Sequence, residues 1–187
     1  MLGSKIELLE DLPIFRGLSA TQLGSIVGAG AKAFFEAGDN LITKDQLGNT
    51  AYLILSGTAR CVHFPGTPAA GDKIEPGSLV GELAMLVDTV HTLTVQAKVR
   101  VRALALTREA LKYTMERDPA IAQQIADNLL ARLQTFARDV RRLDNLLANI
   151  EGSSIFGGGA HGRLTDGSAR RISQLPFLLA QKSSKFG

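Results

Sequence analysis

TAYLILSGTARCVHF, from Thr50 to Phe64, is the stretch that decides the predicted fold. Two apolar runs flank a glycine, which is typical of two β-strands joined by a tight turn. Four similar segments fill the rest of the region from Ala33 to Leu106: AFFEAGDNLITKD, DKIEPGSLVGE, TLTVQAKV and RVRALALT. The turns between them are expected at Gly38, Gly48, Gly57, Gly66, Gly71 and Gly77. Short strands at this spacing predict an antiparallel sandwich or a jelly-roll barrel.

Helical patterns flank this β region. Apolar residues recur at helical spacing from Ile6 to Ala31, where Pro13 and Gly17 interrupt them. Ser19 is expected to be the N-cap of the second N-terminal helix. The predicted fold is therefore mainly β with flanking helices. It is a double-stranded β-helix (jelly roll) over residues 1–118, followed by a long C-terminal helix.

The period becomes helical again after the β region. Thr107 is expected to cap a short helix, and Pro119 to open a long one over residues 119–151. Apolar residues of the long helix recur at alternating spacings of four and three, at Leu129, Leu133, Phe136, Val140, Leu143, Leu147 and Ile150. This heptad spacing favours a homodimeric coiled coil, although a single helix lying on its own barrel is the alternative. In a parallel pair Asp139 would face Asp144, a repulsion of only a few tenths of a kcal/mol.

The C-terminal residues 152–187 have a different composition. GSSIFGGGAHGRLTDGS is too rich in glycine and serine to pack and predicts a flexible linker. The last segment carries a small apolar cluster, Leu175–Leu179, between basic residues. It could dock on the domain, bind a partner, or stay disordered.

The overall composition limits the function classes. The chain has 187 residues, 45% of them hydrophobic and 21% charged, with a formal net charge of +3. These values are ordinary for a globular protein and give no argument for nucleic-acid binding. No apolar run approaches the length of about 20 residues that crosses a bilayer. The N-terminal residues lack a signal-peptide core, so a cytoplasmic protein without membrane contact is expected.

The order of four segments points to a known family. LEDLPIFRGLSATQL, EAGDNLI, AYLILSGTARC and EPGSLVGELAML follow one another between Leu8 and Leu86. In this order they resemble the cyclic-nucleotide-binding domain family, of the catabolite activator protein and kinase regulatory subunit type. The resemblance extends to Ile150 and implies a jelly roll, a regulatory role and a cyclic nucleotide ligand, cAMP or cGMP. It implies no other cofactor.

The segment that matches the family's phosphate-binding cassette runs from Gly81 to Thr94. A helix that begins near Gly81 would present main-chain N–H groups and the positive end of its dipole to an anion. The expected ligand-binding residues are Gly81, Glu82, Leu83, Ala84, His91 and Thr92. The resemblance gives Glu82 the role of accepting from a ribose hydroxyl. The other interpretation is an acidic residue that stabilises the first turn of the helix.

The cassette departs from the family pattern at its end. Members that bind the cyclic phosphate usually have proline and arginine where this chain has Val90 and His91. A neutral histidine donates one hydrogen bond and lacks the bidentate fork of arginine. His91 is therefore either a phosphate donor or a loop histidine without a ligand. Thr92 is either a second phosphate contact or an ordinary strand residue.

The long helix departs from the family pattern as well. Where catabolite activator protein offers two hydroxyl groups to adenine, this chain has Phe136 and Ala137, so adenine selectivity is not implied. Arg132 is expected to be a solvated charge. The three histidines, His63, His91 and His161, have no metal-ligand spacing with one another or with Cys61.

Three functions remain, and none of them is catalytic. The first is a dimeric, regulatory cyclic-nucleotide sensor with a degenerate cassette. The second is a degenerate domain that binds no nucleotide and acts as a dimerising interaction protein. The third is a transcription regulator without its DNA-binding half, because residues 152–187 offer no helix-turn-helix to place in a DNA groove.

Overall fold

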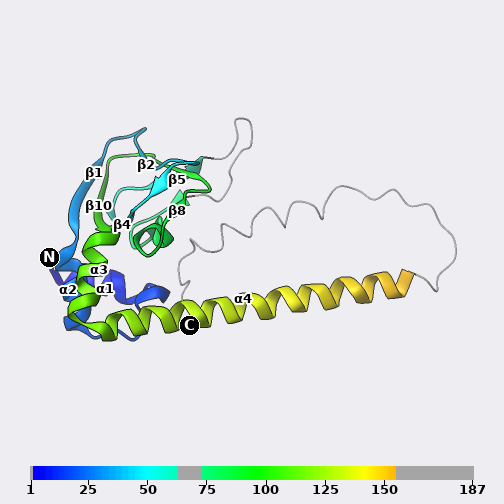
Figure 1. Cartoon of the computed structure of the whole chain (residues 1–187). Coiled ribbons are helices and arrows are strands. Elements are labelled where there is room, and N and C mark those ends of the chain that lie inside the picture. The colour runs from blue at the N-terminus through cyan, green and yellow to red at the C-terminus, as the bar shows by residue number, and fades with distance from the viewer. Residues whose placement is uncertain (1, 63–72, 155–187) are drawn as a thin grey trace.

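The computed structural model describes residues 2–62 and 73–154 (Figure 1). Three short helices precede the β region: α1 (Leu2–Glu10), the 3-10 helix η1 (Pro13–Phe15) and α2 (Ala20–Ala29). Two helices follow it, α3 (Arg108–Arg117) and α4 (Pro119–Ser154). The expected turns at Gly66 and Gly71, both His63 and His161, and the tail beyond Ser154 lie outside the described residues.

The β region confirms the predicted antiparallel barrel. One sheet has the order β1-β10-β4-β7, with β1 (Ala31–Phe35), β10 (Val101–Thr107), β4 (Thr50–Ser56) and β7 (Leu79–Val80). The second has the order β2-β9-β5-β6, with β2 (Asn40–Ile42), β9 (Thr94–Ala97), β5 (Ala59–Val62) and β6 (Lys73–Ile74). A two-stranded pair, β3 (Leu47–Gly48) and β8 (Thr89–Val90), lies beside the 3-10 helix η2 (Glu82–Met85).

Two apolar cores lie on opposite faces of the first sheet. Ile54 and Ala103 pack between the two sheets, inside the barrel. Leu53 and Leu104 point the other way, into a second core that the helices cover and that we call the helix-side core. The central strands β4 and β10 are thus buried on both faces, which explains why their sequences are apolar almost throughout and do not alternate.

The expected helix starts are confirmed. The Ser19 side chain accepts from the main-chain N–H of Gln22, and the Gln22 side chain accepts in return from the main-chain N–H of Ser19. The Thr107 hydroxyl oxygen accepts from the N–H of Ala110 at the start of α3. Pro119 is the first residue of α4, where its missing N–H is not needed.

Helix α4 packs on the domain only at its beginning. Ile121 and Ile125 are buried in the helix-side core, and Leu129 packs against the same core. Beyond them α4 extends away from the barrel (Figure 1). It continues to Ser154, three residues past the expected end at Glu151. Among the helices of the described residues, none has both the length and the apolar character that crossing a bilayer requires.

Candidate functional site

The centre of the predicted cassette is the four-residue helix η2, and Gly81 sets its start. Gly81 has φ +76°, in the left-handed region. A Cβ atom at this position would lie 3.0 Å from the carbonyl oxygen of Thr50 in β4. Glycine is therefore required for both the backbone conformation and the close approach. Ala84 and Met85 are buried at the other end of η2, and Met85 belongs to the helix-side core.

The turn leaves fewer free N–H groups than a longer helix would. The N–H of Ala84 donates to the carbonyl oxygen of Gly81 at 2.9 Å, so that donor is already used. The N–H groups of Glu82 and Leu83 donate to no main-chain carbonyl within residues 2–62 and 73–154. These two groups are the main-chain donors that η2 can offer to an anion.

Glu82 makes an ion pair with Arg132 of α4. Both side chains are largely buried, with 16% of Glu82 and 27% of Arg132 exposed. Burial raises the pKa of the Glu82 carboxyl, while the charge of Arg132 and its hydrogen bond act in the lowering direction. The expectation of a solvated Arg132 is therefore wrong, because the first turns of α4 lie against the domain and bring residue 132 over η2.

His91 follows β8, and its ring lies in a narrow slot. Its main chain is fixed to the loop before β3. The N–H of His91 donates to the carbonyl oxygen of Gln46 at 2.9 Å, and its carbonyl oxygen accepts from the N–H of Asp45 at 2.8 Å. A Cβ atom on Gly48 would lie 2.6 Å from both Cε1 and Nε2 of the ring, and 2.7 Å from the Cβ of Ala84.

We call this place the histidine slot, formed by Gly48, Gly81 and Ala84 around His91. A Cβ atom on Gly81 would lie 3.5 Å from Cε1 of the His91 ring, so the ring is close to the start of η2. Partial burial lowers the pKa of His91. Burial thus favours the neutral ring, whereas an anion beside it would favour the protonated form.

The structure brings most of the predicted site residues together. Five of them surround the start of η2: Gly81, Glu82, Leu83, Ala84 and His91. The side chain of Thr92 is exposed, and no hydrogen bond joins it to the described residues. The Leu83 side chain is also exposed, so its contribution to an anion site is its main-chain N–H.

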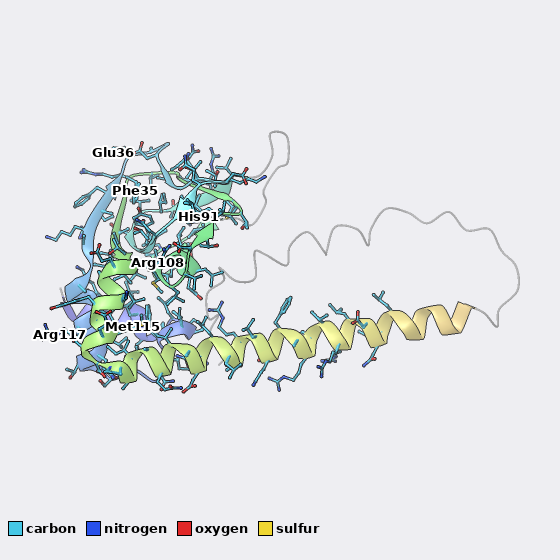
Figure 2. All side chains as sticks on the ribbon, in the orientation of Figure 1. Phe35, Glu36, His91, Arg108, Met115 and Arg117 are labelled. Carbon is cyan, nitrogen blue, oxygen red and sulfur yellow. The ribbon has the colours of Figure 1, made fainter. Side chains whose placement is uncertain are left out.

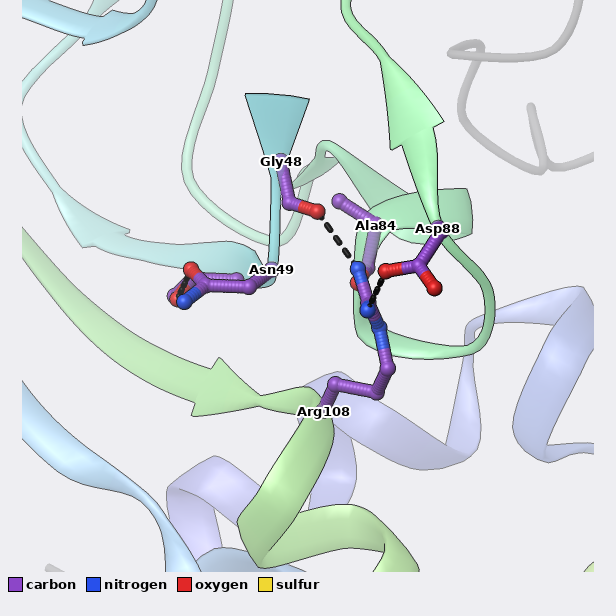
Figure 3. Close-up of polar contacts among 6 residues, drawn as sticks. Gly48, Asn49, Ala84, Asp88 and Arg108 are labelled. Atoms are coloured by element: carbon purple, nitrogen blue, oxygen red, sulfur yellow. Dashed lines mark hydrogen bonds and ion pairs between the residues drawn. The ribbon is translucent and has the colours of Figure 1, made fainter.

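Arg108 also belongs to this site, and the sequence analysis missed it. Its Nη2 donates to the carbonyl oxygen of Gly48 at 2.6 Å and its Nε to that of Ala84 at 3.1 Å. Nη1 pairs with the carboxylate of Asp88 (Figure 3). One signal was present in the sequence: a positive charge at the first position of a helix is unfavourable for the helix dipole, so a specific partner was to be expected.

No metal site is present within the described part of the chain, where no three histidine, cysteine, aspartate or glutamate side chains come together. Cys61 is buried in the barrel core. The chemistry of the site is therefore that of two main-chain donors, a half-buried imidazole and a carboxylate–guanidinium pair.

Comparison with known proteins identifies similar sequences. Residues 32–118 match the family model of the cyclic nucleotide-binding domain. The chain is 36% identical over 96 residues to a cAMP-dependent protein kinase regulatory subunit of Schizosaccharomyces pombe, which covers 51% of this chain and 23% of that protein. It is 27% identical over 128 residues to the cyclic AMP receptor protein of Thermus thermophilus, covering 67% of this chain and 59% of that protein. This chain thus spans less than two thirds of either relative.

Solved structures give the same fold. The N-terminal domain of a transcriptional regulator from Streptomyces coelicolor superposes with a TM-score of 0.64 at 21% identity, covering 71% of this chain and 94% of that domain. Catabolite activator protein of Thermus thermophilus superposes with a TM-score of 0.57 at 26% identity, covering 73% of this chain and 63% of that protein. Both matches are to barrels of the same type as the one described above.

Proposed function

Because residues 32–118 match the family model of the cyclic nucleotide-binding domain, we propose that this chain is a non-catalytic regulatory sensor for cAMP or cGMP. The curated relatives named above are regulatory proteins whose names refer to cyclic AMP. The observation that carries the proposal is the arrangement at η2. Two N–H groups, the His91 ring and the Glu82 carboxylate lie around one glycine turn.

The phosphate and the ribose of a cyclic nucleotide each have a matching group at this site. The cyclic phosphate would accept from the N–H groups of Glu82 and Leu83 and from the protonated ring of His91. The ribose hydroxyl would donate to the Glu82 carboxylate. That carboxylate has about four lone-pair sites, so it can accept from a hydroxyl and from Arg132 at the same time.

The Glu82–Arg132 pair links the site to α4. A ligand that changes the position of Glu82 changes the contact with α4, and thereby the orientation of the long helix. The shift requires different ligand affinities in two positions of the helix. The sensor would pass this change to a partner or to a second copy through the exposed part of α4.

A thermal unfolding experiment tests the proposal. The full chain is heated with cAMP, with cGMP, and with 5′-AMP as the non-cyclic control. A ligand at 100 times its Kd adds about 2.7 kcal/mol of stability. This amount raises the Tm by roughly 5–11 °C for a chain of this size. Equal curves with and without either cyclic nucleotide at millimolar concentration would contradict the sensor.

A second function is favoured by His91, by the used N–H of Ala84, and by the pairing of Glu82 with Arg132. These features suit a degenerate domain that binds no nucleotide and acts as a dimerising interaction protein. The variant His91→Arg separates the two functions. It restores a charged fork worth about 1.5–3 kcal/mol, or roughly ten- to hundredfold in affinity. A Tm shift seen only in this variant would establish the degenerate domain.

The affinity of the sensor is also expected to depend on pH. The pKa of His91 is lowered by burial, so the ring must take up a proton when a phosphate binds beside it. Affinity therefore rises as the pH falls from about 8 to 5.5, by up to tenfold per pH unit. Isothermal titration across this range measures the slope, and His91→Arg is the control because arginine does not titrate there. A flat slope in the wild type would remove His91 from the phosphate site.

A further inference from the structure

The side chain of Arg108 reaches three acceptors from three different parts of the fold. Its guanidinium uses a different nitrogen for each: Nε for Ala84 in η2, Nη2 for Gly48 in β3, and Nη1 for Asp88. The side chain is only 26% exposed, whereas that of Asp88 is 88% exposed. The ion pair with Asp88 therefore contributes little stability, and the position of the Arg108 side chain is set by its two bonds to the buried carbonyl groups of Gly48 and Ala84.

Those two carbonyl groups belong to residues that enclose His91. A Cβ atom added to Gly48 would touch both the His91 ring and the Cβ atom of Ala84, so these three residues lie close together. Figure 2 shows His91 and Arg108 on the same side of the barrel. Arg108 thus bonds to two of the residues that form the histidine slot and links β3 to η2.

The main chain of Arg108 adds a fourth bond. Its N–H donates to the carbonyl oxygen of Asn49 at 2.7 Å, directly after β3. Arg108 is also the first residue of α3, whose Leu111 packs in the same core as Ile121 of α4. A change in the width of the slot must therefore either break the bonds of Arg108 or move the start of α3.

We propose that Arg108 is the positioning residue of the anion site: it holds Gly48 and Ala84 around His91 and couples the width of this slot to α3. This inference rests on the proposed function for its ligand, but not for its geometry. Lysine cannot replace arginine here, because its three donors share one nitrogen, whereas the three acceptors bond to three different nitrogens of the guanidinium.

The variant Arg108→Lys tests the proposal without a ligand. Lysine keeps the positive charge, so any change at His91 reports the geometry of the slot and not a lost charge. NMR titration follows the His91 ring, whose signals are assigned with His91→Gln. In Arg108→Lys the slot opens to water, and the pKa of His91 rises towards its ordinary value because the ring is better solvated. The control is Arg100→Lys, an exposed arginine that pairs with Glu36 at the surface.

Two results obtained without a ligand would overturn the proposal. The first is a His91 pKa in Arg108→Lys that equals the wild-type pKa within the error of the titration. The second uses wild-type protein, so that it holds even if the variant does not fold. The Arg108 Nε–H resonance must shift with the midpoint of the His91 titration, because both groups contact the same two residues. An Nε–H resonance that stays constant through this titration contradicts the coupling.

Ligand binding separates this proposal from the sensor function. If wild type binds cAMP or cGMP, Arg108→Lys should weaken that affinity about tenfold, the equivalent of one lost hydrogen bond in the positioned site. Unchanged affinity in this variant would overturn the positioning role. If wild type binds neither nucleotide, the sensor fails, and the His91 titration still decides the role of Arg108.

Discussion

At the residue scale, the Glu82–Arg132 pair is the contact whose energetics are least obvious. Burial raises the pKa of Glu82 although Arg132 lies beside it, so removing the carboxylate from water outweighs the attraction. A pair of this kind adds little net stability, but removing one partner leaves the other buried and uncompensated. The pair therefore serves to connect η2 with α4 more than to stabilise the fold.

The two single variants of this pair should behave differently. Glu82→Gln keeps an oxygen that can accept from Arg132, so it is expected to change the free energy of unfolding by less than about 1 kcal/mol. Arg132→Leu leaves the carboxylate without a partner and lowers the free energy of unfolding by about 1–3 kcal/mol at pH 7. Without Arg132 the pKa of Glu82 rises further. The stability that Arg132→Leu loses is therefore lost at pH values above this raised pKa. It is recovered as the pH falls below the pKa, because the folded variant binds the proton more tightly than the unfolded chain does.

Urea unfolding at pH 7 and pH 4 measures these differences. The matched control is Arg142→Leu, at an exposed position of the same helix. The double variant Glu82→Gln with Arg132→Leu should recover most of the stability that Arg132→Leu alone loses. A loss in Arg132→Leu that is the same at both pH values would contradict the uncompensated carboxylate.

Much of this site could be predicted from the sequence, but not its long-range contacts. Gly81, Glu82 and His91 lie on one short segment, so local motif and spacing were sufficient to bring them together. Arg132 lies 50 residues from Glu82 in the sequence. Arg108 lies 24 residues from Ala84 and 60 residues from Gly48. Their roles depend on how α3 and α4 pack, and no local pattern contains that information.

At the element scale, the first turns of α4 are fixed to the N-terminal helices. The side-chain amide of Asn128 donates to the carbonyl oxygen of Ile14 in η1 at 2.9 Å. It also donates to that of Arg16, directly after η1, at 2.8 Å. Asn128 is four residues before Arg132, so the two side chains leave α4 on the same face. Asn128 therefore holds the helix at the level where Arg132 reaches Glu82.

The variant Asn128→Ala removes both bonds and leaves two carbonyl groups without their donor. We expect the free energy of unfolding to fall by about 1.5–3 kcal/mol, measured by urea unfolding. Asn145→Ala is the control, since Asn145 is exposed on the same helix and the change in helix propensity is the same. Equal effects of the two variants would show that Asn128 does not anchor α4.

The elements themselves followed from local chemistry. Ser19, Thr107 and Pro119 mark helix starts because each satisfies or avoids an unpaired N–H group. The cassette was less predictable. A short helix was expected after Gly81, and the structure has one, but it is a 3-10 helix of four residues in which Ala84 and Met85 are buried.

At the scale of the whole molecule, the predicted dimer depends on the part of α4 that leaves the domain. Leu129 belongs to the chain's own core, so the alternative of a helix lying on its own barrel holds for the first turns. The next five residues of the heptad seam are exposed: Leu133, Phe136, Val140, Leu143 and Leu147. In Figure 2 this part of α4 lies beyond the barrel, and its side chains project on both sides of the helix.

A second copy of the chain is expected to pack on this seam because the apolar residues alternate at four and three, the spacing of a coiled coil. Leu130 and Leu146 flank the seam at its e and g positions and are also exposed, which widens the apolar surface.

The wild type is therefore expected to sediment at about twice the mass of one 19.9 kDa chain. Leu143→Glu places a charge at the seam and should give a monomer, whereas Asn145→Glu, on the outer face, should leave the dimer intact. Sedimentation equilibrium of the three proteins decides the matter. A monomeric wild type, or a dimeric Leu143→Glu, would mean that α4 does not pair through these residues, and a signal from Glu82 would then need another route out of the domain.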